Sequence, residues 1–162
     1  MNVITSLAIT NLGNPNDPQV VTMLQESDAY HASLYPNESN HLLDVTALTQ
    51  DNVYFFTANV QDSIRGFGAL VVFKDYAEIK RMFVSPQFRG MGIGQQLLKA
   101  LENQASNLEI KIIRLETGTR QPEALSLYTA TGYAMIAPFG DYVLDPLSIF
   151  MEKRLSNKGS FT

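Results

Sequence analysis

The sequence predicts a single domain of mixed α/β class, in which a twisted, mostly antiparallel sheet of six or seven strands is flanked by about four helices. The 162-residue chain has 45% hydrophobic residues and a mean hydropathy of −0.05, as expected for a globular domain with one core. Strand patterns precede, alternate with and follow helix patterns, and no internal repeat or low-complexity tract interrupts them. We therefore expect one domain over residues 1–162, with a core over 2–155 and a frayed tail over 156–162.

The elements follow from apolar periodicity and turn-forming residues. β-Branched and aromatic runs predict strands over residues 3–10, 53–59, 64–73, 76–84, 110–117, 133–136 and 148–153. Helical spacing of apolar residues predicts helices over residues 18–34, 43–49, 92–106 and 122–131. Gly, Pro, Asn and Asp predict loops over residues 11–16, 34–40, 61–63, 74–75 and 137–142.

The helix ends carry recognisable signals. Asp17 is a suitable N-cap and Pro18 suits the first helical position. Pro122 opens the last helix in the same way, and Gly132 stops it. The helix over residues 92–106 is the strongest prediction, because one apolar stripe runs along it: Ile93, Leu97, Leu98, Leu101 and Ala105.

Composition excludes several classes of protein and site. Without cysteine there is no disulfide framework and no thiolate nucleophile, and two histidines ten positions apart, His31 and His41, make no metal pair. The longest apolar stretch, within residues 67–73, is far too short to span a membrane. The first Lys or Arg is Arg65, so the basic start of a secretory signal is missing and a cytoplasmic protein is expected.

Charge is divided unevenly along the chain, whose net charge is −4. Residues 1–64 hold seven acidic and no basic residues, whereas residues 65–162 carry a net charge of +3. If the two parts meet at a cleft, the first suits a cationic ligand and the second an anionic one. The alternative interpretation is that the charges of both parts only keep two protein surfaces solvated.

Three glycines at alternate positions, Gly90, Gly92 and Gly94, lie between a predicted strand and the amphipathic helix. Such a turn exposes backbone N–H groups beside the positive end of a helix dipole, which suits a phosphate group. Arg89 adds a planar set of donors for phosphate oxygens. A tight helix start without a ligand is the structural alternative.

The loop lacks the two common nucleotide motifs. A P-loop needs Gly-Lys-Ser/Thr at the start of the helix, but two glutamines follow Gly94. A dinucleotide fingerprint that begins at Gly90 needs a glycine at the position of Gln95. Nucleotide binding is therefore the least favoured interpretation of the loop. Competition by ATP or NAD at the loop would test it directly.

Residues 77–135 resemble the GNAT family of acyl-CoA-dependent N-acetyltransferases. The family's pyrophosphate loop, Gln/Arg-x-x-Gly-x-Gly/Ala, is matched at each fixed position by residues 89–94, and the preceding Val-x-Pro by residues 84–86. A second family motif, Ala-x-x-x-Tyr followed by a glycine–aromatic pair, is matched by residues 124–128 and the Gly-Tyr after them. The family often has Asn seven positions before this tyrosine, where the present chain has Gln121.

The resemblance implies a GNAT-like fold, acetyl-CoA as co-substrate and no metal. It assigns acetyl-CoA binding to Met82, Phe83, Val84, Arg89, Gly90, Met91, Gly92, Ile93, Gly94, Gln95 and Gln121. The strand pattern agrees, because Glu78 and Lys80 share a nominal face with apolar residues, and a β-bulge would resolve this mismatch. In the family, such a bulge separates two strands, and the pantetheine arm inserts as a strand-like partner. A twisted strand with an exposed charge is the alternative.

Acetyl transfer to an amine needs a base that takes a proton from the amine and an acid that protonates the leaving thiolate. The resemblance implies that Tyr128 is the acid, since a phenol is protonated at neutral pH. Glu78, directly or through a water, is the predicted base, and His31 and Tyr30 are the alternatives. A core tyrosine and a surface carboxylate are the structural interpretations of Tyr128 and Glu78. Without cysteine, no acetyl-thioenzyme can form, so direct attack in a ternary complex is expected.

The predicted acceptor wall comes from the first helix and the loops over residues 34–40 and 139–142. Its acidic and aromatic side chains suit a cationic amine. The acids are Glu26, Asp28, Glu38 and Asp141, and the predicted substrate residues are Tyr30, His31, Tyr35, Asp141 and Tyr142.

A small-molecule amine is the expected partner, with no nucleic acid and no membrane. Acetylation of a protein N-terminus or lysine, and a non-catalytic acyl-CoA sensor, are the alternatives. Members of the family often dimerise, so a homodimer stays open.

Overall fold

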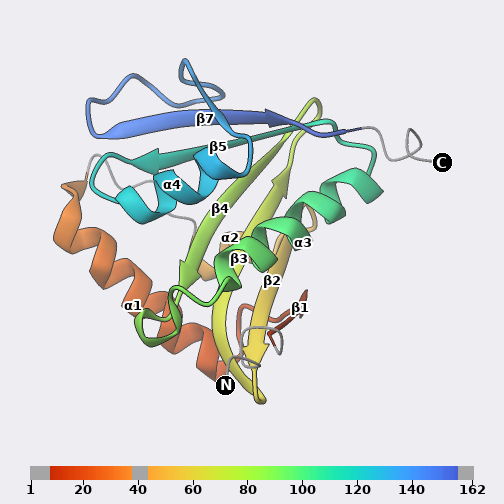
Figure 1. Cartoon of the computed structure of the whole chain (residues 1–162), viewed down its shortest axis with the longest axis vertical. Coiled ribbons are helices and arrows are strands. Elements are labelled where there is room, and N and C mark those ends of the chain that lie inside the picture. The colour runs from red at the N-terminus through yellow and green to blue at the C-terminus, as the bar shows by residue number, and fades with distance from the viewer. Residues whose placement is uncertain (1–7, 38–43, 157–162) are drawn as a thin grey trace.

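The computed structural model describes residues 8–37 and 44–156 as a seven-stranded sheet with helices on both faces (Figure 1). The strand order is β1-β2-β3-β4-β5-β7-β6, in which β4 and β5 are parallel and all other neighbours antiparallel. The strands are β1 (Ile9–Leu12), β2 (Val53–Val60), β3 (Ser63–Val72), β4 (Ala77–Val84), β5 (Ile112–Gly118), β6 (Ala134–Ile136) and β7 (Ser148–Arg154). The helices are α1 (Pro18–Leu34), α2 (Val45–Leu48), η3 (Pro86–Phe88), α3 (Ile93–Asn107) and α4 (Pro122–Ala130). The predicted fold class is confirmed.

The N-terminal strand departs from the prediction. Strand β1 continues to Leu12, where the composition had indicated a turn from residue 11 onward, because Asn11 and Leu12 pair with Thr57 and Phe56 at the sheet edge. The ladder hydrogen bonds outweigh the turn preference of Asn. The strand ends before Gly13, where a Cβ atom would lie 2.5 Å from Cγ2 of Thr57.

Parts of several predicted segments lie outside the described residues. These are residues 3–7 of the first predicted strand, residues 38–40 of the polar loop with Glu38, residue 43 of the short helix, His41, and residues 157–162 of the tail. The described part of the short helix agrees with the prediction: α2 begins after Asp44, whose side chain accepts a hydrogen bond from the N–H of Ala47. None of the helices within the described ranges is long and apolar enough to cross a membrane.

Each face of the sheet buries its own apolar cluster. Helices α3 and α4 cover one face, where the predicted stripe of α3 is buried against alternate residues of β2 to β5 and β7. Helices α1 and α2 cover the other face, where Val20 and Leu24 pack against Phe67 and Phe83. Neighbouring residues of one strand separate accordingly, so that Phe55 faces α1 while Phe56 faces α3.

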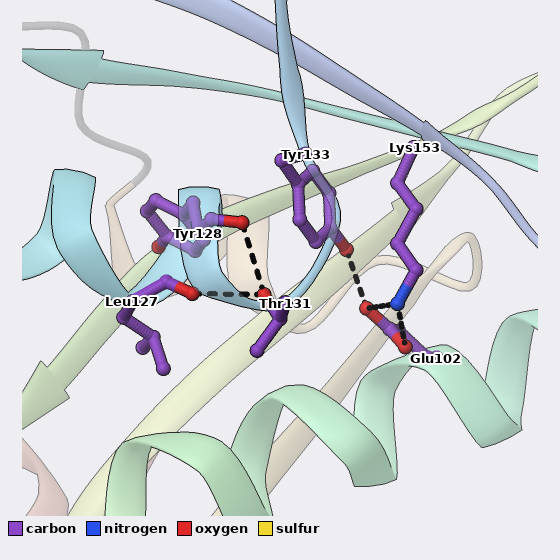
Figure 2. Close-up of polar contacts among 6 residues, drawn as sticks. All are labelled: Glu102, Leu127, Tyr128, Thr131, Tyr133 and Lys153. Carbon is purple, nitrogen blue, oxygen red and sulfur yellow. Dashed lines mark hydrogen bonds and ion pairs between the residues drawn. The ribbon is translucent and has the colours of Figure 1, made fainter.

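The C-terminal end of α4 is tied down by polar contacts (Figure 2). The Thr131 hydroxyl donates to the carbonyl oxygens of Leu127 and Tyr128, at 2.9 and 3.1 Å. Beyond the helix, the Tyr133 hydroxyl donates to Glu102 on α3 at 2.8 Å, and the Lys153 ammonium on β7 reaches the same carboxylate at 3.1 Å. The Thr131 contacts close the end of α4, and the Glu102 contacts join Tyr133 and β7 to α3.

Strands β4 and β5 separate after a short parallel segment (Figure 1). Only residues 77–79 of β4 pair with residues 113–115 of β5, so the C-terminal parts of both strands have no ladder between them. The register of β4 against β3 shifts near Gly68, where Arg81 has a φ of 63°. This is the β-bulge that the mixed polar and apolar pattern predicted, and it turns the end of β4 away from β5.

Candidate active site

A cleft of about 560 Å³ opens where β4 and β5 diverge. Residues from β4, the glycine loop, β5, α4 and the C-terminal half of α1 line it. Ligands in mixed sheets bind at such a divergence because the ends of the strands leave backbone groups unpaired there. Nine of the predicted acetyl-CoA residues line the cleft: Met82, Phe83, Val84, Arg89, Gly90, Gly92, Ile93, Gly94 and Gln121.

The glycine loop has the geometry of an anion site. Gly90 and Gly92 have φ values of 81° and 82°, and Gly92 is the N-cap of α3. A Cβ atom at either position would meet nothing within 4 Å, so glycine is required there by backbone conformation and the space beside the loop is open. The loop presents the N-terminus of a 15-residue helix to that space. These features fit a phosphate-bearing group.

Arg89 lies at the rim of this loop. Its Nε donates to the carbonyl oxygen of Val84 at 3.0 Å, and its guanidinium lies 5.5 Å from the ring centroids of both Tyr30 and Phe83. The exposed guanidinium is thus positioned by β4 and α1 and still borders the cleft.

The residue at the bulge, Arg81, is buried and ties β4 to α1. Its side chain is 2% exposed, its Nη1 donates to Asp28 at 2.6 Å, and its Nη2 donates to the Leu24 carbonyl at 3.4 Å. The sequence analysis did not select Arg81, and the available signal was a cation directly before the apolar end of the strand, residues 82–84. Asp28, predicted as part of an acidic wall, instead pairs with this guanidinium and does not line the cleft.

Tyr128 lies on α4 at the wall of the cleft, 95% buried. Burial, with the charge of Glu116 as the second cause, raises the pKa of its phenol above the ordinary value of 10.0. The phenol is therefore protonated at neutral pH. Its ring packs edge-on against Tyr133, at 5.7 Å between centroids.

Glu78 is equally buried, but its carboxylate is already engaged. The Tyr142 hydroxyl donates to it at 2.5 Å, and the Lys80 ammonium lies 3.7 Å from the same oxygen and donates to the Tyr142 hydroxyl at 2.7 Å. Burial raises the pKa of Glu78, while Lys80 and the Tyr142 hydrogen bond act in the opposite direction. Lys80 lines the cleft, whereas Glu78 and Tyr142 are not among its lining residues.

The aromatic residues of α1 face the loop between β5 and α4. Tyr30, His31 and Tyr35 line the cleft as predicted. The Tyr35 hydroxyl accepts from the N–H of Arg120 and donates to Oε1 of Gln121, both at 3.1 Å. The side-chain amide of Gln121 is therefore hydrogen-bonded to Tyr35 at the end of α1, whereas the resemblance had implied that Gln121 contacts acetyl-CoA.

Other predicted residues lie away from the cleft. Met91 packs against the core on the α3 face, Gln95 is exposed on α3, and Asp141 is exposed in the loop before β7. None of them lines the cleft. Of the acids predicted for the acidic and aromatic acceptor wall, Glu26, Asp28 and Asp141 do not line the cleft, and Glu38 lies outside the described residues.

Sequence reasoning missed a carboxylate that does line the cleft. Glu116 on β5 lies beyond the last residue paired with β4, and the Ser148 hydroxyl donates to it at 2.9 Å. What marks Glu116 as a site residue is its position on β5 beside the diverging part of β4. That position depends on strand pairing, which the sequence does not show. Within residues 8–37 and 44–156, no group of three or more His, Cys, Asp or Glu could hold a metal ion.

Comparison with known proteins agrees with this geometry. The model of the acetyltransferase (GNAT) family matches residues 20–133. The chain is 42% identical over 144 residues to an IAA acetyltransferase from Azospirillum brasilense, covering 88% of this chain and 94% of that protein.

Two solved structures share the fold. The putative acyl-CoA N-acyltransferase from Klebsiella pneumoniae is 32% identical, with a TM-score of 0.82 and coverage of 93% of this chain and 99% of that one. The PaiA N-acetyltransferase from Thermoplasma acidophilum, solved in complex with coenzyme A, is 18% identical, with a TM-score of 0.72 and coverage of 91% and 99%. The chain therefore belongs to the acetyltransferase (GNAT) family and is an N-acetyltransferase.

Proposed function

We propose that the protein transfers the acetyl group of acetyl-CoA to the primary amine of a small molecule, by direct attack within a ternary complex. The observation that carries the acetyl-CoA part is the open glycine loop at the N-terminus of α3, next to the unpaired ends of β4 and β5. The pyrophosphate would lie on the loop N–H groups and Arg89. The pantetheine arm would pair with the free edge of residues 82–84.

A small acceptor is supported by the bridge across the other end of the cleft. Arg120 donates from its side chain to the Leu34 carbonyl and from its backbone to Tyr35, which joins the end of α1 to the β5–α4 loop. Tyr35 and Gln121 belong to this bridge and also line the cleft. A bridge at this place narrows the acceptor end, so it favours a compact amine over a polypeptide segment.

The proposed chemistry requires one acid at the thioester. As the amine nitrogen forms its bond to the acetyl carbon and the carbon–sulfur bond breaks, the thiolate takes the phenol proton of Tyr128, and a proton from the new amide nitrogen replaces it. Tyr128 is suited to this role because it is neutral, buried and on the wall of the cleft. The remaining ammonium proton must pass to a base, for which Glu78 and His31 are the predicted candidates.

The first test is a thermal-shift titration with acetyl-CoA, with ATP and NAD as parallel controls. At one hundred times its dissociation constant, a ligand adds about 2.7 kcal/mol to the free energy of unfolding, which raises Tm by about 5–10 °C for a chain of this size. A shift with acetyl-CoA alone supports the proposal. A shift with ATP or NAD instead would overturn it.

The second test separates an enzyme from an acyl-CoA sensor. Tyr128→Phe removes only the hydroxyl, so acetyl-CoA should bind with unchanged Kd while kcat falls about 100-fold to 10,000-fold, measured by thiol release with a panel of small primary amines. Tyr54→Phe, on β2 and outside the cleft lining, is the matched control because it also removes one phenol hydroxyl. No turnover by the wild-type protein with any amine, together with normal acetyl-CoA binding, would favour the sensor.

A further inference from the structure

A chain of four contacts crosses the acceptor end of the cleft, from the backbone of Arg120 through the side chains of Tyr35, Gln121 and His31 to the backbone of Ser27. At one end, the backbone N–H of Arg120, which can only donate, donates to the Tyr35 hydroxyl at 3.1 Å. The Tyr35 hydroxyl then donates to Oε1 of Gln121 at 3.1 Å. At the other end, Nδ1 of His31 lies 2.9 Å from the carbonyl oxygen of Ser27, which can only accept.

The partners of the two ring nitrogens assign the tautomer of His31 in this arrangement. Because the Ser27 carbonyl accepts, Nδ1 of His31 must carry a proton. Because Oε1 of Gln121 faces Tyr35, its amide nitrogen faces Nε2 of His31, at 3.5 Å. A donor opposite Nε2 requires a lone pair there, so His31 is neutral with its basic nitrogen turned toward Gln121.

The hydrogen bond that the basic nitrogen of His31 accepts from Gln121 is weak. A separation of 3.5 Å is at the limit of a hydrogen bond, so an incoming amine can replace the amide at little cost. Burial, as the largest cause, lowers the pKa of His31 below 6.5, so the lone pair is available at neutral pH.

Neighbouring groups shift the pKa of His31 in both directions. Arg81 on β4 lowers the pKa of His31, whereas the Ser27 carbonyl and Asp28 on α1 raise it. The rings of Tyr30 and Tyr35 lie 5.9 and 6.4 Å from the imidazole centroid.

The other candidate base is less accessible. Glu78 is held by Tyr142 at 2.5 Å, has Lys80 beside it, and is absent from the cleft lining, whereas His31 lines the same cleft as Tyr128. Using Glu78 would require the loop that carries Tyr142 to release it first. His31 needs only the displacement of a weak amide contact.

We propose that Nε2 of His31 is the base that takes the ammonium proton of the acceptor, and that Gln121 and Tyr35 are positioning residues that hold the imidazole in the basic tautomer. The proposal rests on the proposed acetyl transfer. The ammonium gives one proton to Nε2 and the resulting amine attacks the thioester; the imidazolium later releases that proton to solvent. When Nε2 is protonated, the Gln121 amide can turn over so that its oxygen accepts from Nε2–H. Arg120 N–H and the Gln121 amide then both donate to Tyr35.

The kinetic test compares variants at the two candidate bases, His31 and Glu78, and at Glu116, the carboxylate that lines the cleft. His31→Gln should lower kcat about 100-fold to 10,000-fold, with an unchanged Kd for acetyl-CoA. It should also abolish the acid limb of the pH profile, which is the fall of kcat/KM at low pH. Ala32→Gln, at the next and exposed position of α1, is the matched control and should behave as the wild type. Loss of the limb in Glu78→Gln or Glu116→Gln, with the limb retained in His31→Gln, would overturn the proposal.

The positioning role has its own test. Gln121→Glu puts an acceptor opposite Nε2, which favours the imidazolium, so the acid limb of kcat/KM should move to higher pH. A purely structural role of Gln121 would change stability or KM but would leave the position of the limb unchanged. An unmoved limb in an active, folded Gln121→Glu protein would therefore contradict the proposal.

Nuclear magnetic resonance of the histidine rings gives an answer that does not depend on finding an acceptor. The sequence contains only His31 and His41, and the His31→Gln spectrum assigns the two rings. We expect His31 as the Nδ1–H tautomer, with a pKa below 6.5 that rises in Gln121→Glu. An Nε2–H ring would overturn the proposal even in an active enzyme. Failure of every amine to release thiol would instead overturn the proposed function and leave the ring result standing.

Discussion

Gly118→Ala should disrupt the bridge over the acceptor end by a purely steric route. A Cβ atom at Gly118 would lie 1.8 Å from the Tyr35 hydroxyl oxygen and 2.2 Å from Cζ of the same ring. The φ of Gly118 lies outside the left-handed region, so alanine adds no backbone strain there. The ring, which is 93% buried, must therefore move.

The size of the effect follows from what the ring leaves behind. To restore ordinary contact at 3.4 Å, the hydroxyl oxygen must retreat by about 1.6 Å, which breaks its hydrogen bonds to Arg120 and Gln121. Two hydrogen bonds at about 1 kcal/mol each, with some strain from the added methyl, predict a loss of about 2–3 kcal/mol in the free energy of unfolding.

A double-mutant cycle in urea measures this prediction. In the Tyr35→Ala background there is no ring to displace, so Gly118→Ala should then cost less than about 0.5 kcal/mol. The coupling free energy between the two positions should thus account for most of the 2–3 kcal/mol effect. An equal cost of Gly118→Ala in both backgrounds would refute the steric argument, since the effect would then come from the backbone of β5.

Two further predictions concern other parts of the site. Gly92→Ala forces a left-handed alanine at the N-cap of α3 and should cost about 1–2 kcal/mol in stability and weaken acetyl-CoA binding. Gly94→Ala, without positive φ, should be milder in urea unfolding, and equal costs would argue against the conformational explanation. Tyr133→Phe removes the hydrogen bond to Glu102 that Figure 2 shows and should lower the free energy of unfolding by about 1–2 kcal/mol while the Kd of acetyl-CoA stays unchanged. A changed Kd would mean that α4 is positioned through this contact more tightly than we infer.

Local sequence signals determined most of the elements and the donor side of the site. Asp17 with Pro18, the stripe of α3 and the pair Pro122 and Gly132 fix helix ends and faces within a few residues, so the prediction was accurate there. The alternate glycines predicted the turn before α3, and the structure adds that Gly90 and Gly92 have positive φ whereas Gly94 lies inside the helix.

The same local reasoning was wrong where a neighbouring strand decided the outcome. Residues 11 and 12 extend β1 because β2 offers them partners, and no property of Asn or Leu encodes that pairing. The bulge of β4 could be inferred from a broken alternation, whereas the separation of β4 from β5, seen beyond residue 79, was expected only from the family resemblance.

The acceptor side depended on tertiary structure. From the sequence alone, Glu78 was an isolated carboxylate, His31 a lone helical histidine and Gln121 a substitute for asparagine. Glu78 and His31 could equally have had only structural roles. Only the fold brings Tyr142 onto Glu78 and sets Gln121 between Tyr35 and His31, across 86 and 90 positions of the chain. The sequence by itself predicted a phosphate-binding loop, because consecutive backbone groups form such a loop, and the acyl donor followed only from the family resemblance. Which side chains handle the acceptor proton was decided by tertiary packing, because hydrogen-bond direction and burial arise only between distant segments.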